Sequence, residues 1–499
     1  MRRTRWMYFR AILTGALAAP AVGCSGEARS PEETHAHATA KQEASLHETF
    51  QDPTCGFIPC PVSVAGNVLT LVGSCATFST MFIPEGYTLD GAGHSIIAID
   101  GPTTHFVGPI ARNCGTSASY RNLRLMMLGL ASVCDVGDDM LTGIVFDNAS
   151  GSVVNTQLFN IRHGDGSGGC QEGVGVMVRN EGTTTETRTV DIRNSFLVGH
   201  QKAGIVATGD VVVNVTRNRI MGAGPIGNIA QAGVQLGLGA TGSVVGNSIS
   251  GHSYTGEGVA AGILVYGGEQ YGGPLSTGVT IRDNALFNND IGVYLAQGNA
   301  DGSPPPVPTD IEVVGNLIHY DDVTNGYVYQ AGISDLGTGN VIHSNVVTGA
   351  GYDPATLPEA TYAVDVLAGA AANLTFLTPA HTSTVGTCSG PLIVQTQDAS
   401  GNLSRSAATT FDVTATGPAS VGLQFFANAS CTGPAVTTLD LGNAQAQATF
   451  SFRARTPGSA VVSVGNGALS RAQTQQVLGG LAPGREAPLA GAPLEAPLR

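Results

Sequence analysis

The chain has 499 residues, and its 37 acidic side chains outnumber its 23 basic ones, which gives a formal net charge of −14 at pH 7. Binding to nucleic acid needs a basic surface that displaces counterions from the phosphates, so this charge excludes that class of partner. An acidic chain with 68 glycines and only 12% charged residues suits a neutral or cation-bridged polymer better.

Residues 1–24 are typical of an export signal. A basic start precedes an apolar stretch, residues 11–22, that is too short to span a bilayer. The stretch ends in Ala21-Val22-Gly23-Cys24, which resembles a bacterial lipobox. The resemblance implies that Cys24 carries lipid and becomes the mature N-terminus, with ordinary signal-peptidase cleavage as the alternative. We therefore expect a protein of the bacterial cell envelope that meets the membrane through a lipid anchor only, or an extracellular protein.

Residues 25–52 are polar, with scattered Glu and His and few large apolar side chains. Such a composition cannot bury a core, so a disordered linker between the lipid and the folded body is expected. His35, His37 and His47 have no acidic or Cys partner at ligand spacing, which favours a solvated linker over a metal site.

From residue 53 to 371 the chain repeats a unit of about thirty residues. In each copy a glycine follows a small or apolar residue and precedes an apolar one, and successive glycines are 29 to 40 residues apart. A repeat of this kind predicts a solenoid, whose turns bury their apolar faces only by stacking on one another. The glycines are Gly143, Gly175, Gly204, Gly233, Gly262, Gly292 and Gly332.

The register of this repeat predicts which side chains point into the core. Because side chains alternate along a strand, the residue after each glycine and the residue two further on share the buried face. These residues are Ile144, Phe146, Val176, Val178, Ile205, Ala207, Val234, Leu236, Ile263, Val265, Val293 and Leu295.

A second strand in each coil alternates apolar and other residues, as in Val213-x-Val215, and leads to a bend that carries a recurring polar residue. Amide side chains stacked at one bend can bond the coils above and below, so the pattern predicts an internal ladder. The ladder positions are Thr156, Ser195, Asn218, Asn247, Asn284, Asn316 and Asn345.

This arrangement resembles the right-handed parallel β-helix of the pectate-lyase-like superfamily. The segment from Ile83-Pro84-Glu85-Gly86 to Gly91-Ala92-Gly93 looks like the usual first rung of that family. The resemblance covers about residues 60 to 370 and implies the fold. It leaves the activity open, because the superfamily holds lyases, hydrolases, epimerases and non-catalytic surface proteins.

Residues 372–478 lose the thirty-residue period and carry about seven short alternating segments between turn residues. This pattern predicts a β-sandwich, and the segment resembles bacterial immunoglobulin-like modules. A passive spacer is favoured over a sugar-binding role. Residues 479–499 are rich in Pro, Ala and Gly and are expected to be disordered. The predicted fold class is therefore all-β, a right-handed parallel β-helix followed by an immunoglobulin-like β-sandwich.

Apart from Cys24, the chain has eight cysteines, and an even set in an exported chain favours disulfides. Cys388 and Cys431 lie alone in the C-terminal region, so we expect them to pair. The other six can pair in fifteen ways, and the sequence leaves the choice open.

The sequence lacks most of the motifs that a hydrolase on this fold would need. Polygalacturonase-like glycosidases on this fold carry an Asn-x-Asp, an Asp-Asp pair and a Gly-His-Gly, of which the chain has only the pair Asp138-Asp139. An inverting hydrolase needs two carboxyl groups about 6.5–9.5 Å apart across the sugar. Since no second set is recognisable, both aspartates are interpreted as loop residues.

Stacking the coils suggests a different catalytic group. Aligning Gly175 with Gly204 places Glu172 beside Gln201, and Gln231 falls in register with Lys202, on rungs about 4.8 Å apart. Lys202 is also the single lysine of the region expected to fold.

These residue types fit a polysaccharide lyase. β-Elimination on a uronate polymer needs a base for the C5 proton and a group that neutralises the carboxylate. The candidate bases are Lys202, His200 and His163, and the candidate substrate ligands are Glu172 and Gln231. Asp165 or Glu172 could hold a cation, with calcium as the candidate ion, and no other cofactor is predicted. The alternative is a Glu172–Lys202 salt bridge on a solvated face.

Nine tyrosines fall in the later coils, among them Tyr266 and Tyr294, our candidates for sugar contacts. Aromatic faces exposed along a solenoid can stack on sugar rings, although packing in loops explains their presence equally well. Three functions remain: binding of extracellular polysaccharide through the β-helix, which we favour, a polysaccharide lyase, and a non-catalytic adhesive or structural spacer. Whether the protein is an enzyme stays open.

Overall fold

The computed structural model describes residues 51–52, 55–164, 169–180, 186–301, 303–357, 360–366, 371–398, 404, 409–442 and 446–479. Cys24, Asp165, the expected signal peptide, nearly all of the expected linker and nearly all of the C-terminal tail lie outside these residues. The chain divides into two compact units, residues 1–368 and 369–499. No helix in the described ranges is both long and apolar enough to cross a membrane.

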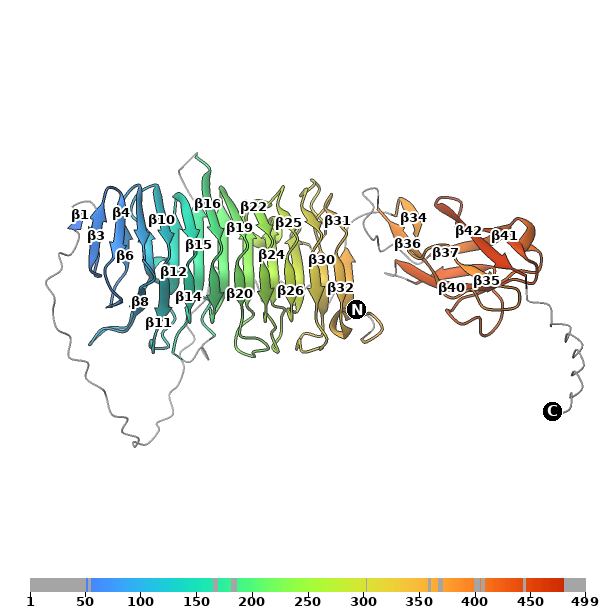
Figure 1. Ribbon diagram of the computed structural model, residues 1–499, viewed down its shortest axis with the longest axis horizontal. Coiled ribbons are helices and arrows are strands. Elements are labelled where there is room, and N and C mark those ends of the chain that lie inside the picture. The colour runs from blue at the N-terminus through green and yellow to red at the C-terminus, as the bar shows by residue number, and fades with distance from the viewer. Residues whose placement is uncertain are drawn as a thin grey trace, which may run out of the picture. The chain divides into compact units, whose positions relative to one another are not determined.

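The first unit is a right-handed parallel β-helix, in which each coil contributes one strand to each of three sheets (Figure 1). Sheet I contains β6 (Met81–Ile83), β9 (Pro109–Asn113), β12 (Thr142–Asp147), β15 (Val174–Asn180), β18 (Ala203–Gly209), β21 (Ala232–Gly237), β24 (Ala261–Gly267), β27 (Ile291–Gln297), β30 (Gln330–Asp335) and β33 (Thr361–Val366).

Sheet II contains β3 (Val62–Ala65), β4 (Val68–Leu71), β7 (Tyr87–Asp90), β10 (Ser117–Arg121), β13 (Ser150–Val154), β16 (Arg188–Arg193), β19 (Val211–Thr216), β22 (Thr241–Val245), β25 (Thr280–Arg282), β28 (Glu312–Val314) and β31 (Val341–His343). Sheet III contains β5 (Cys75–Thr77), β8 (Ser95–Ala98), β11 (Arg124–Met127), β14 (Gln157–Phe159), β17 (Phe196–Val198), β20 (Arg219–Met221), β23 (Ser248–Ser250), β26 (Ala285–Phe287), β29 (Leu317–His319) and β32 (Val346–Thr348).

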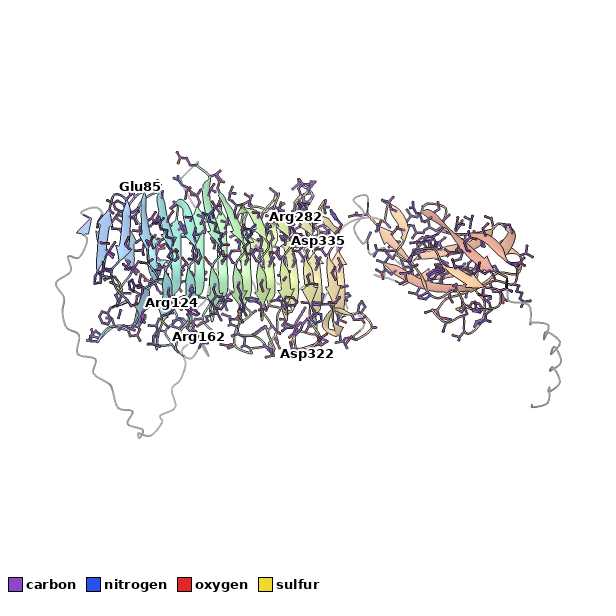
Figure 2. All side chains as sticks on the ribbon, viewed as in Figure 1. Glu85, Arg124, Arg162, Arg282, Asp322 and Asp335 are labelled. Carbon is purple, nitrogen blue, oxygen red and sulfur yellow. A yellow bond between two sulfur atoms is a disulfide. The ribbon has the colours of Figure 1, made fainter. Side chains whose placement is uncertain are left out.

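The chain visits the sheets in the order I, II, III, and loops of different length lead from sheet III back to sheet I. Arg162 and Asp322, from two of these loops, both lie along the lower edge of the unit in Figure 2. The first unit also holds a short antiparallel pair, β1 (Gln51–Asp52) and β2 (Gly56–Phe57), so the last two residues of the expected linker belong to a strand. Its 3-10 helices are η2 (Gly137–Asp139), η3 (Glu269–Tyr271) and η4 (Ala350–Tyr352).

The recurring glycines of sheet I lie where a side chain has no room. A Cβ atom on Gly233 would come within 2.4 Å of Ile249 Cγ2 in sheet III and within 2.5 Å of the carbonyl oxygen of Gly262 in the next coil. Gly204 has the corresponding neighbours, Ile220 and Gly233. Each glycine therefore lets sheet I approach sheet III and the following coil closely, which explains why the repeat requires this residue.

The predicted core register is confirmed. All twelve side chains expected to point inward are completely buried in one continuous apolar core. Val234, for example, lies between Ile205 and Ile263 of the neighbouring strands of sheet I.

The predicted ladder is confirmed as well. Asn247 Oδ1 accepts from the backbone N–H and the Nδ2 of Asn218, at 2.8 and 3.1 Å, and Asn247 Nδ2 donates to Asn284 Oδ1 at 3.0 Å. The residue before each ladder position has a positive φ, as at Arg217 and Asp283, so the chain turns sharply there. The side-chain amides satisfy the backbone groups that this turn removes from the sheets.

The second unit is a β-sandwich of two sheets. One sheet holds β34 (Asn373–Phe376), β36 (Leu392–Gln397), β40 (Gln447–Arg453) and β38 (Gln424–Phe426). The other holds β35 (Thr382–Thr384), β42 (Ser470–Leu478), β41 (Gly458–Gly465), β37 (Thr409–Thr416) and β39 (Thr438–Leu441), and η5 (Pro418–Ser420) follows β37. Aromatic side chains such as Phe411, Phe450 and Phe452 fill the space between the two sheets.

Four disulfides link the described cysteines. Cys388 and Cys431, the pair expected from the sequence, are joined within the sandwich. The six cysteines of the β-helix pair as Cys55–Cys114, Cys60–Cys75 and Cys134–Cys170.

Candidate functional site

The outward face of sheet I carries the two side-chain clusters that are most suited to binding a ligand. Outward positions of this sheet lie between the inward core residues, so they form rows that run along the helix axis, one residue per coil. The middle row reads Arg112, Val145, Met177, Val206, Gln235, Leu264, Tyr294, Ser334 and Asp365 from β9 to β33.

Five tyrosines gather at the C-terminal part of this face, and we call them the aromatic cluster: Tyr266, Tyr271, Tyr294, Tyr329 and Tyr362. The rings of Tyr266 and Tyr271 meet edge to face at 5.5 Å between centroids, and those of Tyr329 and Tyr362 are 5.5 Å apart. Tyr294 is buried, and the other four are half-buried. The sequence candidates Tyr266 and Tyr294 thus belong to one apolar cluster, together with three tyrosines that were not candidates for sugar contacts.

Glycine and acidic residues complete the aromatic cluster. The ring of Tyr266 lies across Gly237 of β21, where a Cβ atom would be within 2.2 Å of the ring. The hydroxyl group of Tyr329 donates to Asp365 Oδ2 at 2.8 Å and lies 2.9 Å from the hydroxyl oxygen of Ser334. Rings for stacking and polar atoms for hydrogen bonds therefore occur side by side on this face.

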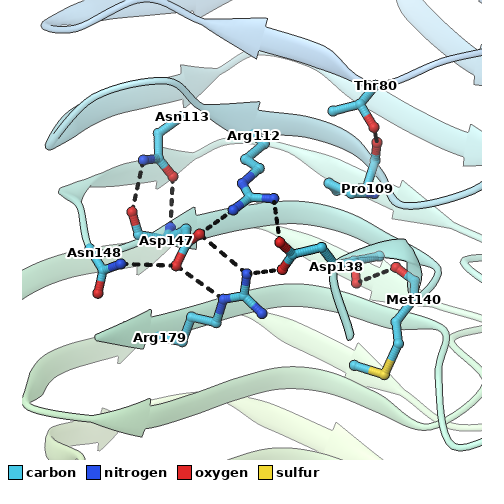
Figure 3. A network of polar contacts seen from close by, with 10 residues as sticks. Thr80, Pro109, Arg112, Asn113, Asp138, Met140, Asp147, Asn148 and Arg179 are labelled. Atoms are coloured by element: carbon cyan, nitrogen blue, oxygen red, sulfur yellow. Dashed lines mark hydrogen bonds and ion pairs between the residues drawn. The ribbon is translucent and has the colours of Figure 1, made fainter. Parts of the chain in front are cut away.

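A second group, which we call the arginine cluster, lies at the N-terminal part of the same face (Figure 3). Arg112 of β9 and Arg179 of β15 reach toward each other across β12, and the carboxylates of Asp147 and Asp138 contact both guanidinium groups. Arg179 Nε lies 3.1 Å from Asp147 Oδ1, and Arg112 Nη1 lies 3.6 Å from Asp138 Oδ2. A pocket at this cluster is also lined by Met140, Val145 and Met177.

Glu172 and His163 form a buried pair that holds two loops together. Glu172 accepts from the backbone N–H groups of Asp135 and Leu141, at 2.9 and 2.7 Å, and its Oε1 lies 2.8 Å from His163 Nε2. Burial by itself would lower the pKa of His163, but the bonds to Glu172 and to the Ala131 carbonyl oxygen outweigh burial and raise it. The expected alternative, a Glu172–Lys202 salt bridge on a solvated face, is therefore wrong, because Glu172 is buried and paired with a histidine.

His200 is buried against a histidine that the sequence did not suggest. The rings of His200 and His252 stack with 5.3 Å between centroids, and their Nε2 atoms are 3.2 Å apart. His252 Nδ1 donates to Asn289 Oδ1 at 2.9 Å, so His252 Nε2 accepts the hydrogen bond that His200 Nε2–H donates. Burial lowers the pKa of both imidazoles, that of His252 to about 4, which keeps the pair neutral.

Lys202 hydrogen-bonds through its side chain to a backbone carbonyl oxygen and not to either candidate histidine base. Its side chain is half-buried, its Nζ donates to the carbonyl oxygen of Ala230 at 3.1 Å, and burial lowers its pKa to about 8. Gln231, predicted on the next rung, is buried and donates to the carbonyl oxygens of His200 and Gln201. His163 and His200 are 1% and 2% exposed, so neither of these candidate bases lies on an open surface beside Lys202.

The physical reason is that the loops from sheet III to sheet I fold their polar side chains inward. There these groups satisfy one another, as buried polar groups must. The candidate bases His163 and His200 are among these inward side chains. Asp165, the other candidate for holding a cation, lies outside the described residues.

The buried histidine pair makes stability sensitive to acid. Both folded-state pKa values lie below the 6.5 of an unfolded histidine, so the unfolded chain binds more protons as the pH falls below about 6.5. Stability should therefore decline from about pH 6.5 toward pH 4. Denaturant unfolding at several pH values measures this slope, which His252→Gln should flatten and the exposed control His343→Gln should not. An unchanged slope in His252→Gln would contradict this account.

The chain matches no family model and no curated protein. Its candidate function therefore follows from the geometry of its own residues.

Proposed function

We propose that this protein is an exported, lipid-anchored protein of the bacterial cell envelope that binds extracellular polysaccharide on the outward face of sheet I. The aromatic cluster carries this proposal, because it gathers four half-buried tyrosine rings around Tyr294 on the outward side of sheet I. Such rings bury apolar area against the flat faces of hexoses. Asp365, which is half-buried, adds a carboxylate that a sugar hydroxyl group can contact.

The architecture supports the same proposal. Coils that repeat about every 4.8 Å offer equivalent positions to an extended polymer along the helix axis. The fold resembles the pectate-lyase-like superfamily, and we propose that the C-terminal sandwich is an immunoglobulin-like spacer. Four disulfides fit a protein that folds in an oxidising compartment such as the cell envelope or the exterior. Attachment of lipid at Cys24 completes this proposal.

The test is retention of the protein on a panel of immobilised polysaccharides. We expect at least one neutral or acidic polymer to retain the wild type, and Tyr266→Ala or Tyr329→Ala to weaken retention about tenfold, because each loses one stacking ring. Tyr87→Ala, which removes a half-buried tyrosine from sheet II, is the control and should bind normally. If the panel retains no protein, the spacer function is the better description. If it retains the cluster variants as strongly as the wild type, the aromatic cluster is not the binding site.

A polysaccharide lyase is the second candidate, because Lys202 is only half-buried just before β18 of sheet I and burial lowers its pKa to about 8. A base works best when its pKa lies near the working pH, and about 8 is within that range. The same incubations can be followed by ultraviolet absorbance from unsaturated sugar ends. New absorbance that disappears in Lys202→Met would establish the lyase, whereas retention without absorbance leaves binding alone.

A further inference from the structure

The arginine cluster has one member that differs from the others. The side chains of Arg112, Arg179 and Asp147 are 20%, 21% and 20% exposed, and all three come from strands of sheet I. Asp138 comes from η2 in the loop before β12, and its side chain is 62% exposed. The two arginines and Asp147 are thus part of the rigid face, while Asp138 reaches it from outside.

The charges of the cluster indicate what Asp138 does. Without Asp138, the two guanidinium groups and one carboxylate would leave a net charge of +1 in a partly buried setting, where an unpaired charge is costly. The Asp138 carboxylate removes this excess, and its hydrogen bond with Arg179 lowers the Asp138 pKa. A carboxylate is therefore the chemical group that this position accepts, with one oxygen atom facing each guanidinium group.

The tip of the loop is held at its two ends and by one backbone hydrogen bond, which the Gly108 N–H donates to the carbonyl oxygen of Asp139 at 2.8 Å. Cys134 is bonded to Cys170, and the backbone N–H groups of Asp135 and Leu141 are bound by Glu172. Between these anchors η2 contains no buried residue, and Gly137 has a positive φ of 65°. The contacts of Asp138 with the arginines can therefore be exchanged for those of another carboxylate without unfolding the coil.

We propose that Arg112 and Arg179 form a binding site for a carboxylate-bearing ligand, and that Asp138 occupies this site as a competitor built into the chain. The proposal rests on the proposed function and extends it, because the ligand is then a polysaccharide containing uronic acids. From β15, the strand of Arg179, to β24, the strand of Tyr266, the same face runs over three rungs, or about 14 Å. One polymer chain can therefore contact both clusters.

The experiment compares Asp138→Asn with Asp139→Asn by calorimetric titration. Asp139 is exposed on the same loop, and within the described ranges it makes no salt bridge, so the pair of variants is matched in net charge. The probes are an oligogalacturonate, its methyl ester and galacturonate monomer. Asp138→Asn should bind the oligogalacturonate about fivefold to tenfold more tightly than the wild type, and Asp139→Asn should not. Binding of the uncharged methyl ester should be the same in all three proteins.

Adding Arg179→Gln to Asp138→Asn supplies the converse test. The double variant should lose the gain in affinity for oligogalacturonate. Equal affinity of Asp138→Asn and wild type for oligogalacturonate would overturn the inference, as would an equal gain in Asp139→Asn. If the methyl ester binds through the tyrosines while Asp138→Asn shows no gain, the proposed function stands and the inference fails. If Asp138→Asn binds galacturonate but the tyrosine variants bind polymers normally, the inference stands and the aromatic site fails.

Discussion

Val234→Asp is expected to prevent the first unit from folding. Val234 is completely buried in β21, and its strand neighbours in the core, Ile205 and Ile263, are apolar. A carboxylate there has no partner, so it must remain charged in an apolar setting or take up a proton, and either outcome costs several kcal/mol. Since a domain is stable by only about 5–15 kcal/mol, one such change is decisive.

The position of Val234 in the solenoid enlarges the effect. Each coil is stabilised by its two neighbours, so loss of a middle coil also uncovers the coils on both sides. Circular dichroism and the yield of soluble protein measure the outcome. Gln235→Asp is the matched control, because Gln235 is the next residue on the same strand but is half-buried on the outward face. Folded Val234→Asp protein with a wild-type melting temperature would disprove the core register.

Asn247→Leu is expected to destabilise the first unit by about 2–6 kcal/mol. The substitution keeps the approximate volume but removes the acceptor for the backbone N–H of Asn218 and the donor to the carbonyl oxygen of Val215. Both backbone groups then remain buried without this hydrogen-bond partner, which costs about 1–3 kcal/mol for each group. The free energy of unfolding in denaturant provides the measurement.

Asn214→Leu serves as the control for the ladder. Asn214 lies on the outer side of sheet II, is half-buried, and bonds Asp191 and Ser243 through its side chain. Water can replace these bonds, so the cost should stay below about 1 kcal/mol. If both variants lose the same stability, the ladder has no special role.

Features that repeat in every coil could be predicted from the sequence. Gly233 recurs as Gly204 and Gly262 because each coil must approach the next one in the same way. Asn247 recurs as Asn218 and Asn284 because each sharp bend leaves the same backbone groups without a sheet partner. Such requirements are local and periodic, so composition and spacing are sufficient to reveal them. The pairing of Cys388 with Cys431 was accessible for a simpler reason, since no other cysteine lies near them in the sequence.

The candidate site was only partly accessible. Tyr266 and Tyr294 were singled out, but Tyr271 and Tyr329 join them from a 3-10 helix and a loop whose paths the repeat does not determine. Arg112 and Arg179 are 67 positions apart, with Asp147 between them, and only the stacking of β9, β12 and β15 brings the three together. Asp138 was interpreted as a loop residue, which is its location, but its contact with two arginines could not be foreseen.

The sequence by itself determined the all-β class, the coil repeat, the inward side chains and the asparagine ladder. The tertiary structure decided the pairing of the six cysteines in the β-helix, the partner of Glu172 and the stacking of His200 on His252. The division has a physical cause. Strands must match their neighbours at a fixed spacing, so their residue pattern repeats once in every coil. Loops between sheet III and sheet I differ in length from coil to coil, and the partners of their side chains are set only when the coils have stacked.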